Sequence, residues 1–140
     1  MAEFIATALQ TVESNQNILF TDTTVCGSNS IVHRNGSGLV TLRGITNQCR
    51  ARFKVTFGAN IAVPADGTAE AISVAIALNG EPIISTTMIV TPAAVEEFFN
   101  VNRSLYLDIP AGCCSQISVR NTSTQAIDVQ NASLIVERVA

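Results

Sequence analysis

The sequence has few charged residues and few aromatic ones. Of its 140 residues only 14% are charged and 5% aromatic, with no tryptophan and one tyrosine. Globular proteins usually carry about 25% charged residues. A monomer with so few charged residues can hardly cover its whole surface with polar groups. We therefore expect either an unusually large core or apolar surface that another subunit buries, and we favour the second explanation.

Long apolar runs are missing as well. The most apolar stretch, Ile72 to Leu78, is far shorter than the roughly 20 residues of a membrane-spanning helix. Near the amino terminus, Glu3 stands where a signal peptide would carry lysine or arginine. We therefore expect no membrane partner and synthesis in a cytoplasm, where the protein stays or which it leaves by another route, such as release of an assembled particle. The net charge of −3 and the pI near 5.0 argue against binding to a nucleic acid polymer.

Catalytic groups are scarce. The single histidine, His33, alternates with Val32 and Arg34 on an expected strand. A Ser/His/Asp or Cys/His arrangement would have to use it, with Cys26 and Asp22 as the nearest helpers. A lone strand histidine is far more often a surface or interface residue, so we expect that the chain is not an enzyme. Metal-ligand spacing is absent too, and we expect no cofactor.

The four cysteines do not form a recognisable site. Cys26 and Cys49 are isolated, and Cys113 and Cys114 are adjacent. None has CxxC spacing, and adjacent cysteines rarely bridge each other without strain. We expect buried free thiols, because free cysteine is among the most buried residue types. A Cys26–Cys49 disulfide is the chief alternative.

Alternation with a period of two dominates the sequence. In Arg50 to Phe57, the apolar side chains of Ala51, Phe53, Val55 and Phe57 share one face, as a half-buried strand requires. This pattern predicts one antiparallel β-sandwich domain, residues 1–140, of nine or ten strands. The other expected strands are Ile18–Phe20, Ser30–Arg34, Leu39–Arg43, Ala71–Leu78, Ile83–Val90, Ser104–Ile109, Gln116–Arg120, Ile127–Val129 and Ser133–Val139.

Turn signals separate these strands. Asn79-Gly80 suits a tight hairpin, and Pro110-Ala111-Gly112 suits a turn that begins with proline. A single short helix is expected at Pro92 to Phe99, with Thr91 as its cap and Pro92 at its first position.

A face of small residues is the first candidate interface. In Ile72–Leu78, the side chains of Ser73, Ala75 and Ala77 lie opposite the apolar core face. Small residues let another backbone approach closely, which suits a subunit interface. Cover by a loop of the same chain is the alternative.

A basic stripe is the second candidate. Arg50, Arg52 and Lys54 share one face of their strand, with Arg43 nearby in the sequence. One hypothesis is that these residues bind an acidic partner, including the phosphates of a nucleotide. The alternative is pairing with acidic side chains of a neighbouring strand or subunit, which is common in sheets.

The order of these signals resembles the tumour necrosis factor-like jelly roll, the family that includes the globular heads of complement and collagen-type proteins. The resemblance rests on the segments FIATALQ, NILFTD, GSGLVTLRGITNQCRARFKVTF, VAIALNGEPI, LYLDIPAGCCSQISVRN and ASLIVERV. The chain departs from the family at Cys113, where an acidic residue is usual, and in its scarce aromatic residues. The resemblance implies a jelly-roll fold.

The whole chain, including GITNQCRAR and NTSTQAIDVQNA, is similar to small proteins that prophages of gut Firmicutes encode near their head genes. That similarity implies a homotrimer with a structural role in the virion, as a capsid decoration or head-fibre protein. A phage capsid or a host surface glycan are then the expected partners. Two alternatives stay open: a surface adhesin or ligand-recognition head of the same fold, and a phage protein that sequesters a signalling nucleotide through the basic stripe.

Overall fold

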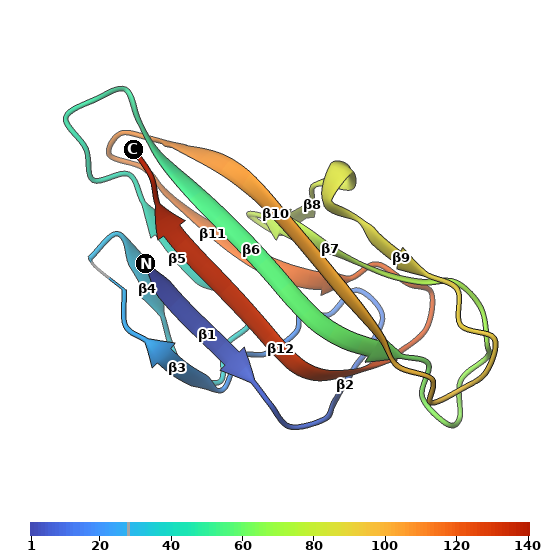
Figure 1. The fold of residues 1–140 in the computed structure, drawn as a ribbon. Helices are drawn as coiled ribbons and strands as arrows, with labels where there is room; N and C mark the ends of the chain where they lie inside the picture. Colours follow the sequence, from blue (N-terminus) through green and yellow to red (C-terminus); the bar gives the residue numbers. More distant parts are fainter. Residues whose placement is uncertain (28) are drawn as a thin grey trace.

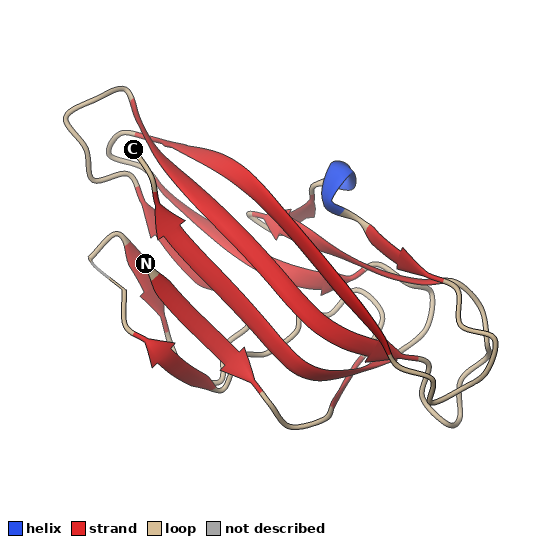
Figure 2. Ribbon diagram, in the orientation of Figure 1, coloured by secondary structure: helices blue, strands red, loops and turns tan. Residues whose placement is uncertain are grey.

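Two antiparallel sheets packed face to face form the molecule, as the alternating pattern predicts. The computed structural model describes residues 1–27 and 29–140. Its two layers of long, inclined strands are seen in Figure 1, and strands dominate the secondary structure in Figure 2. The elements in chain order are β1 (Ala2–Ala6), β2 (Gln10–Val12), β3 (Asp22–Val25), β4 (Ile31–His33), β5 (Val40–Arg43), β6 (Arg50–Ala62), β7 (Ile72–Leu78), β8 (Glu81–Pro82), the 3-10 turn η1 (Ile84–Thr86), β9 (Met88–Val90), β10 (Phe99–Pro110), β11 (Cys114–Asn121) and β12 (Ile127–Arg138).

The sheets join strands that lie far apart in the sequence. Sheet A has the order β10-β6-β12-β1-β3, with β2 beside β12. Sheet B has the order β4-β5-β11-β7-β8, with β9 beside β7. The longest ladder pairs β6 with β10 from Arg50↔Pro110 to Ile61↔Phe99. This ladder places the start of β6 and the end of β10 at one end of the sandwich, beside the end of β12.

The core lies between the sheets and follows the alternation of β6. Phe53 and Phe57 are fully buried, as predicted, and they pack among inward side chains of both sheets such as Leu134 and Ile76. Arg52 and Lys54 lie on the opposite, half-exposed face of the strand. We call this face of β10, β6 and β12 the outer face of sheet A.

Both expected turns form. Asn79 and Gly80 have φ values of 52° and 86°, which is the conformation of a tight hairpin between β7 and β8. At the other turn, Gly112 has a φ of 77° and the amide of Cys113 donates to the carbonyl of Pro110 at 3.1 Å.

The expected helix at Pro92–Phe99 is wrong. These residues form turns that lead into β10. Glu96 has a φ of 59°, which no right-handed helix allows, and its amide donates to the carbonyl of Val63 at 2.7 Å. Val95 packs against the core from the same segment. These tertiary contacts override the local helix signals.

Several expected strand boundaries also change. The expected strands Ile127–Val129 and Ser133–Val139 are one strand, β12, with a bulge near Asn131, whose φ is 53°. Within Ile83–Val90, the turn η1 precedes a short β9. Ile18 and Phe20 are fully buried, yet only an isolated bridge from Phe20 to Ser37 forms there. Residues 1–27 and 29–140 form twelve strands, because β1, β2, β3 and β8, which have two to five residues each, add to those expected.

Candidate functional site

The basic stripe pairs with an acidic side chain of the neighbouring strand. Arg52 and Asp108 are register partners on β6 and β10. The Nε and Nη2 atoms of Arg52 donate to Oδ1 and Oδ2 of Asp108 at 2.8 and 3.2 Å. The Nε atom of Arg50 lies 3.1 Å from Oδ2 of the same carboxylate. One carboxylate thus holds two guanidinium groups in fixed positions, which is the pairing within a sheet that the sequence left as an alternative.

The electrostatics of this pair follow from its geometry. Hydrogen bonding to Arg52, assisted by the charges of Arg52 and Arg50, lowers the pKa of Asp108 below its ordinary value. Hydrogen bonding to Asp108 raises the pKa of Arg52, and the nearby Tyr106 adds to this effect. Both groups are therefore charged at neutral pH.

A cavity opens directly beside this pair. Its volume is about 480 Å³, and its lining is Arg52, Tyr106, Asp108, Val139 and Ala140. Tyr106 is 63% exposed and is the register partner of Lys54. Since residues two apart on a strand share a face, Tyr106 and Asp108 lie side by side on the outer face of sheet A. The sequence pointed to the arginines of this site but not to Tyr106.

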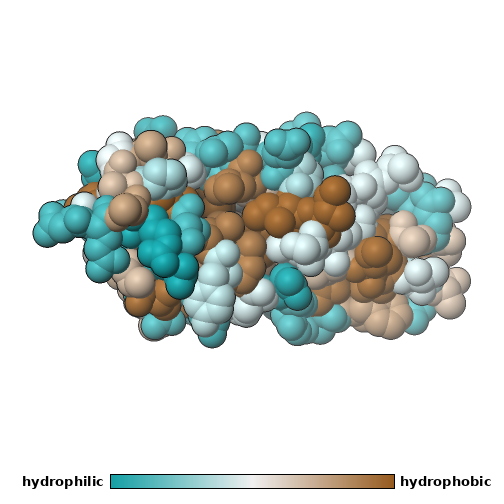
Figure 3. All heavy atoms as spheres, turned by 90° about the horizontal axis from the view of Figure 1, so that it is seen from above, coloured by the Kyte–Doolittle hydropathy of each residue, from teal (hydrophilic) through white to brown (hydrophobic). Residues whose placement is uncertain are grey.

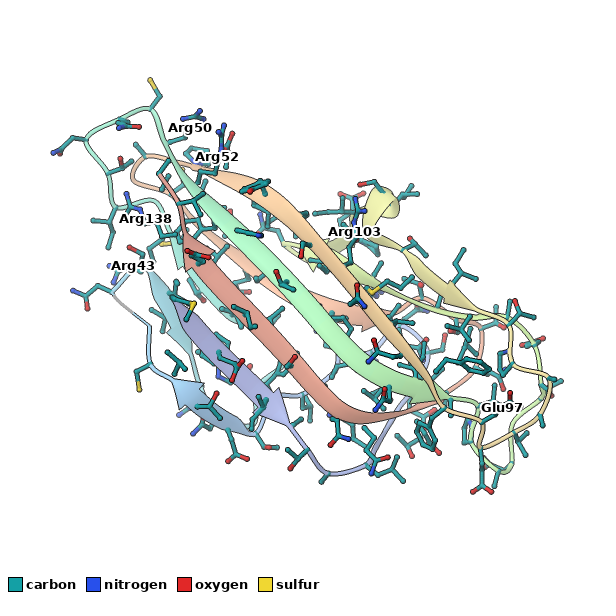
Figure 4. The ribbon with its side chains drawn as sticks, viewed as in Figure 1. Arg43, Arg50, Arg52, Glu97, Arg103 and Arg138 are labelled. Atoms are coloured by element: carbon teal, nitrogen blue, oxygen red, sulfur yellow. The ribbon has the colours of Figure 1, made fainter. Side chains whose placement is uncertain are left out.

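Four arginines gather at this end of the sandwich. Figure 4 shows Arg43, Arg50, Arg52 and Arg138 near one end, whereas Glu97 lies at the other. Within residues 1–27 and 29–140, both side-chain salt bridges go to Asp108. Arg138 instead donates to the hydroxyl of Ser30 at 3.1 Å and to the backbone oxygen of Ala140 at 3.3 Å. This end is therefore positive although the chain as a whole is negative.

An apolar edge runs along the adjoining side of the sandwich. Ile84 in η1 is 85% exposed and Ile89 in β9 is 68% exposed. Ile83 and Leu105 are partly buried beside the core, and β10 contacts both η1 and β9 where the edges of the sheets meet. Figure 3, which views the molecule from this side, shows a run of hydrophobic residues between polar flanks. We call the strip with Ile84 and Ile89 the apolar edge.

The small-residue face is placed differently from these surfaces. Ala75 and Ala77 are fully buried within the single chain. Ser73 is half-buried, and its hydroxyl lies 2.6 Å from that of Thr122. Beside them, the hydroxyl of Thr86 accepts from the amide of Ile76 at 3.0 Å. The chain itself buries both alanines, so the apolar surface that is left for a partner lies elsewhere.

The cysteines correct one expectation. All four, Cys26, Cys49, Cys113 and Cys114, are free thiols and exposed. The expectation that they are buried is wrong, and the alternative Cys26–Cys49 disulfide does not form. The reason is their position: Cys26, Cys49 and Cys113 lie in loops, and Cys114 is the first residue of β11. The amide of Ala111 donates to the carbonyl of Cys49 and that of Gly44 to the carbonyl of Cys113, so the two loops associate through backbone groups and not through their thiols.

The side chain of His33 packs against an aromatic ring and a backbone carbonyl. Its ring lies 4.4 Å from that of Phe4, and its Nε2 lies 2.9 Å from the carbonyl oxygen of Ser37. In the described part of the chain, no cluster of three or more His, Cys, Asp or Glu side chains could hold a metal ion. The same residues include no helix that is long and apolar enough to cross a membrane.

Comparisons with known proteins show similarity of fold. The sequence matches no protein-family model, and no curated protein is significantly similar to it. Among solved structures, the globular domain of zebrafish complement 1qA protein superposes with a TM-score of 0.60 at 9% identity, covering 96% of this chain and 94% of that one.

Two further structures match more loosely. The sugar-binding C-terminal domain of EclA has a TM-score of 0.44 at 16% identity, over 94% of this chain and 79% of that one. A family 35 carbohydrate-binding module from an environmental isolate has a TM-score of 0.42 at 11% identity, over 100% and 98%. At such identities the comparisons concern the fold alone, and the chain has a jelly-roll β-sandwich fold similar to the globular domain of complement C1q.

Proposed function

We propose that this protein is a non-enzymatic structural component of a phage virion. It is made in the bacterial cytoplasm, assembles into a homotrimer, and forms the head of a decoration or head-fibre protein that presents its loops outward. The observation that carries the proposal is the apolar edge, with Ile84 and Ile89 largely exposed. The virion as its location rests on the resemblance of segments such as GITNQCRAR and NTSTQAIDVQNA to those of prophage proteins.

A second copy of the same chain is the occupant that the edge fits. The edge is apolar, and only 14% of the residues of the chain are charged, so a second copy can cover the edge with little burial of charge. When identical copies contact one another around a symmetry axis, the ring closes. The apolar edge of every copy is then covered by its neighbour and not left in water. Burial of such side chains stabilises an assembly by about 25 cal/mol for each Å² removed from water.

The oligomer is tested by size-exclusion chromatography with light scattering. We expect three times the chain mass of 14.8 kDa at micromolar concentration. Ile84→Glu and Ile89→Glu should lower the mass to that of one chain without changing the far-ultraviolet circular dichroism. Val32→Glu is the matched control, since Val32 is also exposed but lies on β4. A monomeric parent, or an equal effect of the control, would contradict the proposal.

The location is tested on particles. We expect mass spectrometry of purified virions to detect the chain in stoichiometric amounts, and cryo-electron microscopy to show its three-fold density on the head. Recovery of the chain solely from the soluble lysate would contradict a virion role. The mass measurement and the virion measurement test different parts of the proposal, because a trimer is also compatible with a protein of a host cell surface.

A ligand-recognition role is the second candidate, and one observation favours it. The cavity beside Arg52 and Tyr106 combines an exposed aromatic ring with charges fixed by Asp108. A subunit that only assembles has no need of such a site.

A further inference from the structure

The two arginines of the outer face keep unused donors. Arg52 uses Nε and Nη2 for Asp108, and Arg50 lies against the same carboxylate through Nε. Across the residues that the structure describes, no hydrogen bond engages Nη1 of Arg52 or the terminal nitrogens of Arg50. Because Asp108 already fixes the guanidinium planes, these N–H groups can bind an anion with little further loss of side-chain entropy.

The local charge favours an anion. Arg50, Arg52 and Lys54 share the face with Asp108 and Glu137, the register partner of Lys54. Arg43 and Arg138 lie toward the same end (Figure 4). A single negative group therefore meets a net positive field here. A group with two negative charges would be repelled more strongly by the ionised Asp108.

Tyr106 supplies the apolar part of the site. Its ring is 63% exposed on the outer face and lines the cavity together with Arg52 and Asp108. An aromatic face binds flat apolar surface, and the phenol hydroxyl can hydrogen-bond. A ring bound there keeps its other face in water, which suits a sugar ring, whose edge carries hydroxyl groups, better than a nucleobase, which is best stacked on both sides.

From this geometry we propose that the cavity binds a saccharide that carries a carboxylate. The sugar ring lies on Tyr106, and the carboxylate accepts from the unused N–H groups of Arg52, which lines the cavity. Arg50 is not part of the lining but lies beside it against Asp108, from where it adds a second donor, and Asp108 acts as a positioning residue. The volume of about 480 Å³ lies within the usual range of small-ligand sites, roughly 300–1,000 Å³.

The site is open, so one copy should bind weakly. Strong attachment then needs several copies on one assembly, because linked sites raise avidity by about 10²- to 10⁴-fold without any new contact. This second step rests on the proposed trimer, whereas binding of one sugar to one site does not.

Binding is measured on the full chain by two-dimensional NMR, with D-glucuronate as the probe. We expect glucuronate to shift the Nε–H signal of Arg52, and D-glucose and acetate to bind at least tenfold more weakly. Tyr106→Ala and Arg52→Lys should each weaken glucuronate binding tenfold or more. Arg103→Lys is the matched control, because Arg103 is an exposed arginine elsewhere on β10.

Three results would overturn the proposal. Equal affinity for acetate and glucuronate would mean an adventitious ion only. Tighter binding of adenosine monophosphate than of glucuronate would mean a nucleotide site. An equal loss in Arg103→Lys would mean unspecific charge attraction.

The oligomer is separated from the site with Ile84→Glu. This variant should keep the parent affinity for free glucuronate but lose attachment to a surface coated densely with glucuronate. If the parent is monomeric yet binds free glucuronate, the site stands and the trimer fails. If the parent is trimeric and does not bind, the trimer stands and the site fails.

Discussion

Arg52 and Asp108 face each other across the β6–β10 ladder and share two hydrogen bonds, at 2.8 and 3.2 Å. This relationship predicts a pH dependence. The pH at which half of the Asp108 carboxyl groups are protonated should lie below 3.8, the ordinary pKa of this group. Because the pKa is lower in the folded state, the stabilisation is complete above pH 3.8 and is lost as pH falls through the folded pKa.

The carboxyl-carbon chemical shift of Asp108, followed in an acid titration, measures this effect. Arg52→Ala should move the midpoint upward toward 3.8, and Arg103→Ala should leave it unchanged. A midpoint at or above 3.8 in the parent would show that the pair does not persist in solution.

The two buried phenylalanines of β6 predict a large loss of stability. Phe53→Ala and Phe57→Ala should each lower the free energy of unfolding by roughly 3–5 kcal/mol, because each leaves a cavity in the core. Urea denaturation followed by circular dichroism measures the loss. Lys54→Ala, on the opposite face, should change it by less than about 0.5 kcal/mol. If Phe53→Ala were as stable as the parent, the register of β6 would be misplaced.

Removal of the buried polar side chain of Asn121 should also lower the free energy of unfolding. Its side chain is fully buried, and its Nδ2 donates to the carbonyls of Val12 and Gln125, each at 3.0 Å. Its Oδ1 accepts from the amide of Ser123 at 2.9 Å. Asn121→Ala removes the side-chain partner of these backbone groups. The free energy of unfolding should fall by about 1–3 kcal/mol for each group that stays buried without a hydrogen bond. The exposed Asn102→Ala should be nearly neutral in the same urea experiment.

The exposed cysteines predict reactive but dispensable thiols. Cys113→Ser and Cys114→Ser should each change the free energy of unfolding by at most about 0.5 kcal/mol, since neither side chain is buried. A thiol reagent should modify four groups per chain without denaturant. Modification that needed urea would restore the expectation of buried thiols.

The sequence predicts the core strand well because its signal is local. Alternation alone places Phe53 and Phe57 inside and Arg52 outside, and Asn79-Gly80 defines its hairpin by backbone preference. Short edge strands such as β8, with two residues, carry too little pattern to be recognised. The absent helix shows the limit of local signals, because the bond from Glu96 to Val63 depends on a distant segment.

The candidate site is only half visible in the sequence. Arg50 and Arg52 appear as a stripe because they lie two residues apart on one strand. Asp108 is 56 residues from Arg52, and no local pattern gives the register that joins them. Tyr106 enters the site through the same register, so its role becomes visible only once β6 and β10 are paired.

The position of β12 in sheet A determines when this chain can fold. It lies between β6 and β1 and pairs with both, so a strand more than 100 residues after β1 in the chain holds the centre of the sheet. Until β12 leaves the ribosome, β1 lacks its main partner and β6 exposes one side of its backbone. Sheet A can therefore form only after β12 is available, at the millisecond-to-second pace of sheets built from distant strands. During that interval the unpaired strands depend on dilution or a chaperone to avoid aggregation.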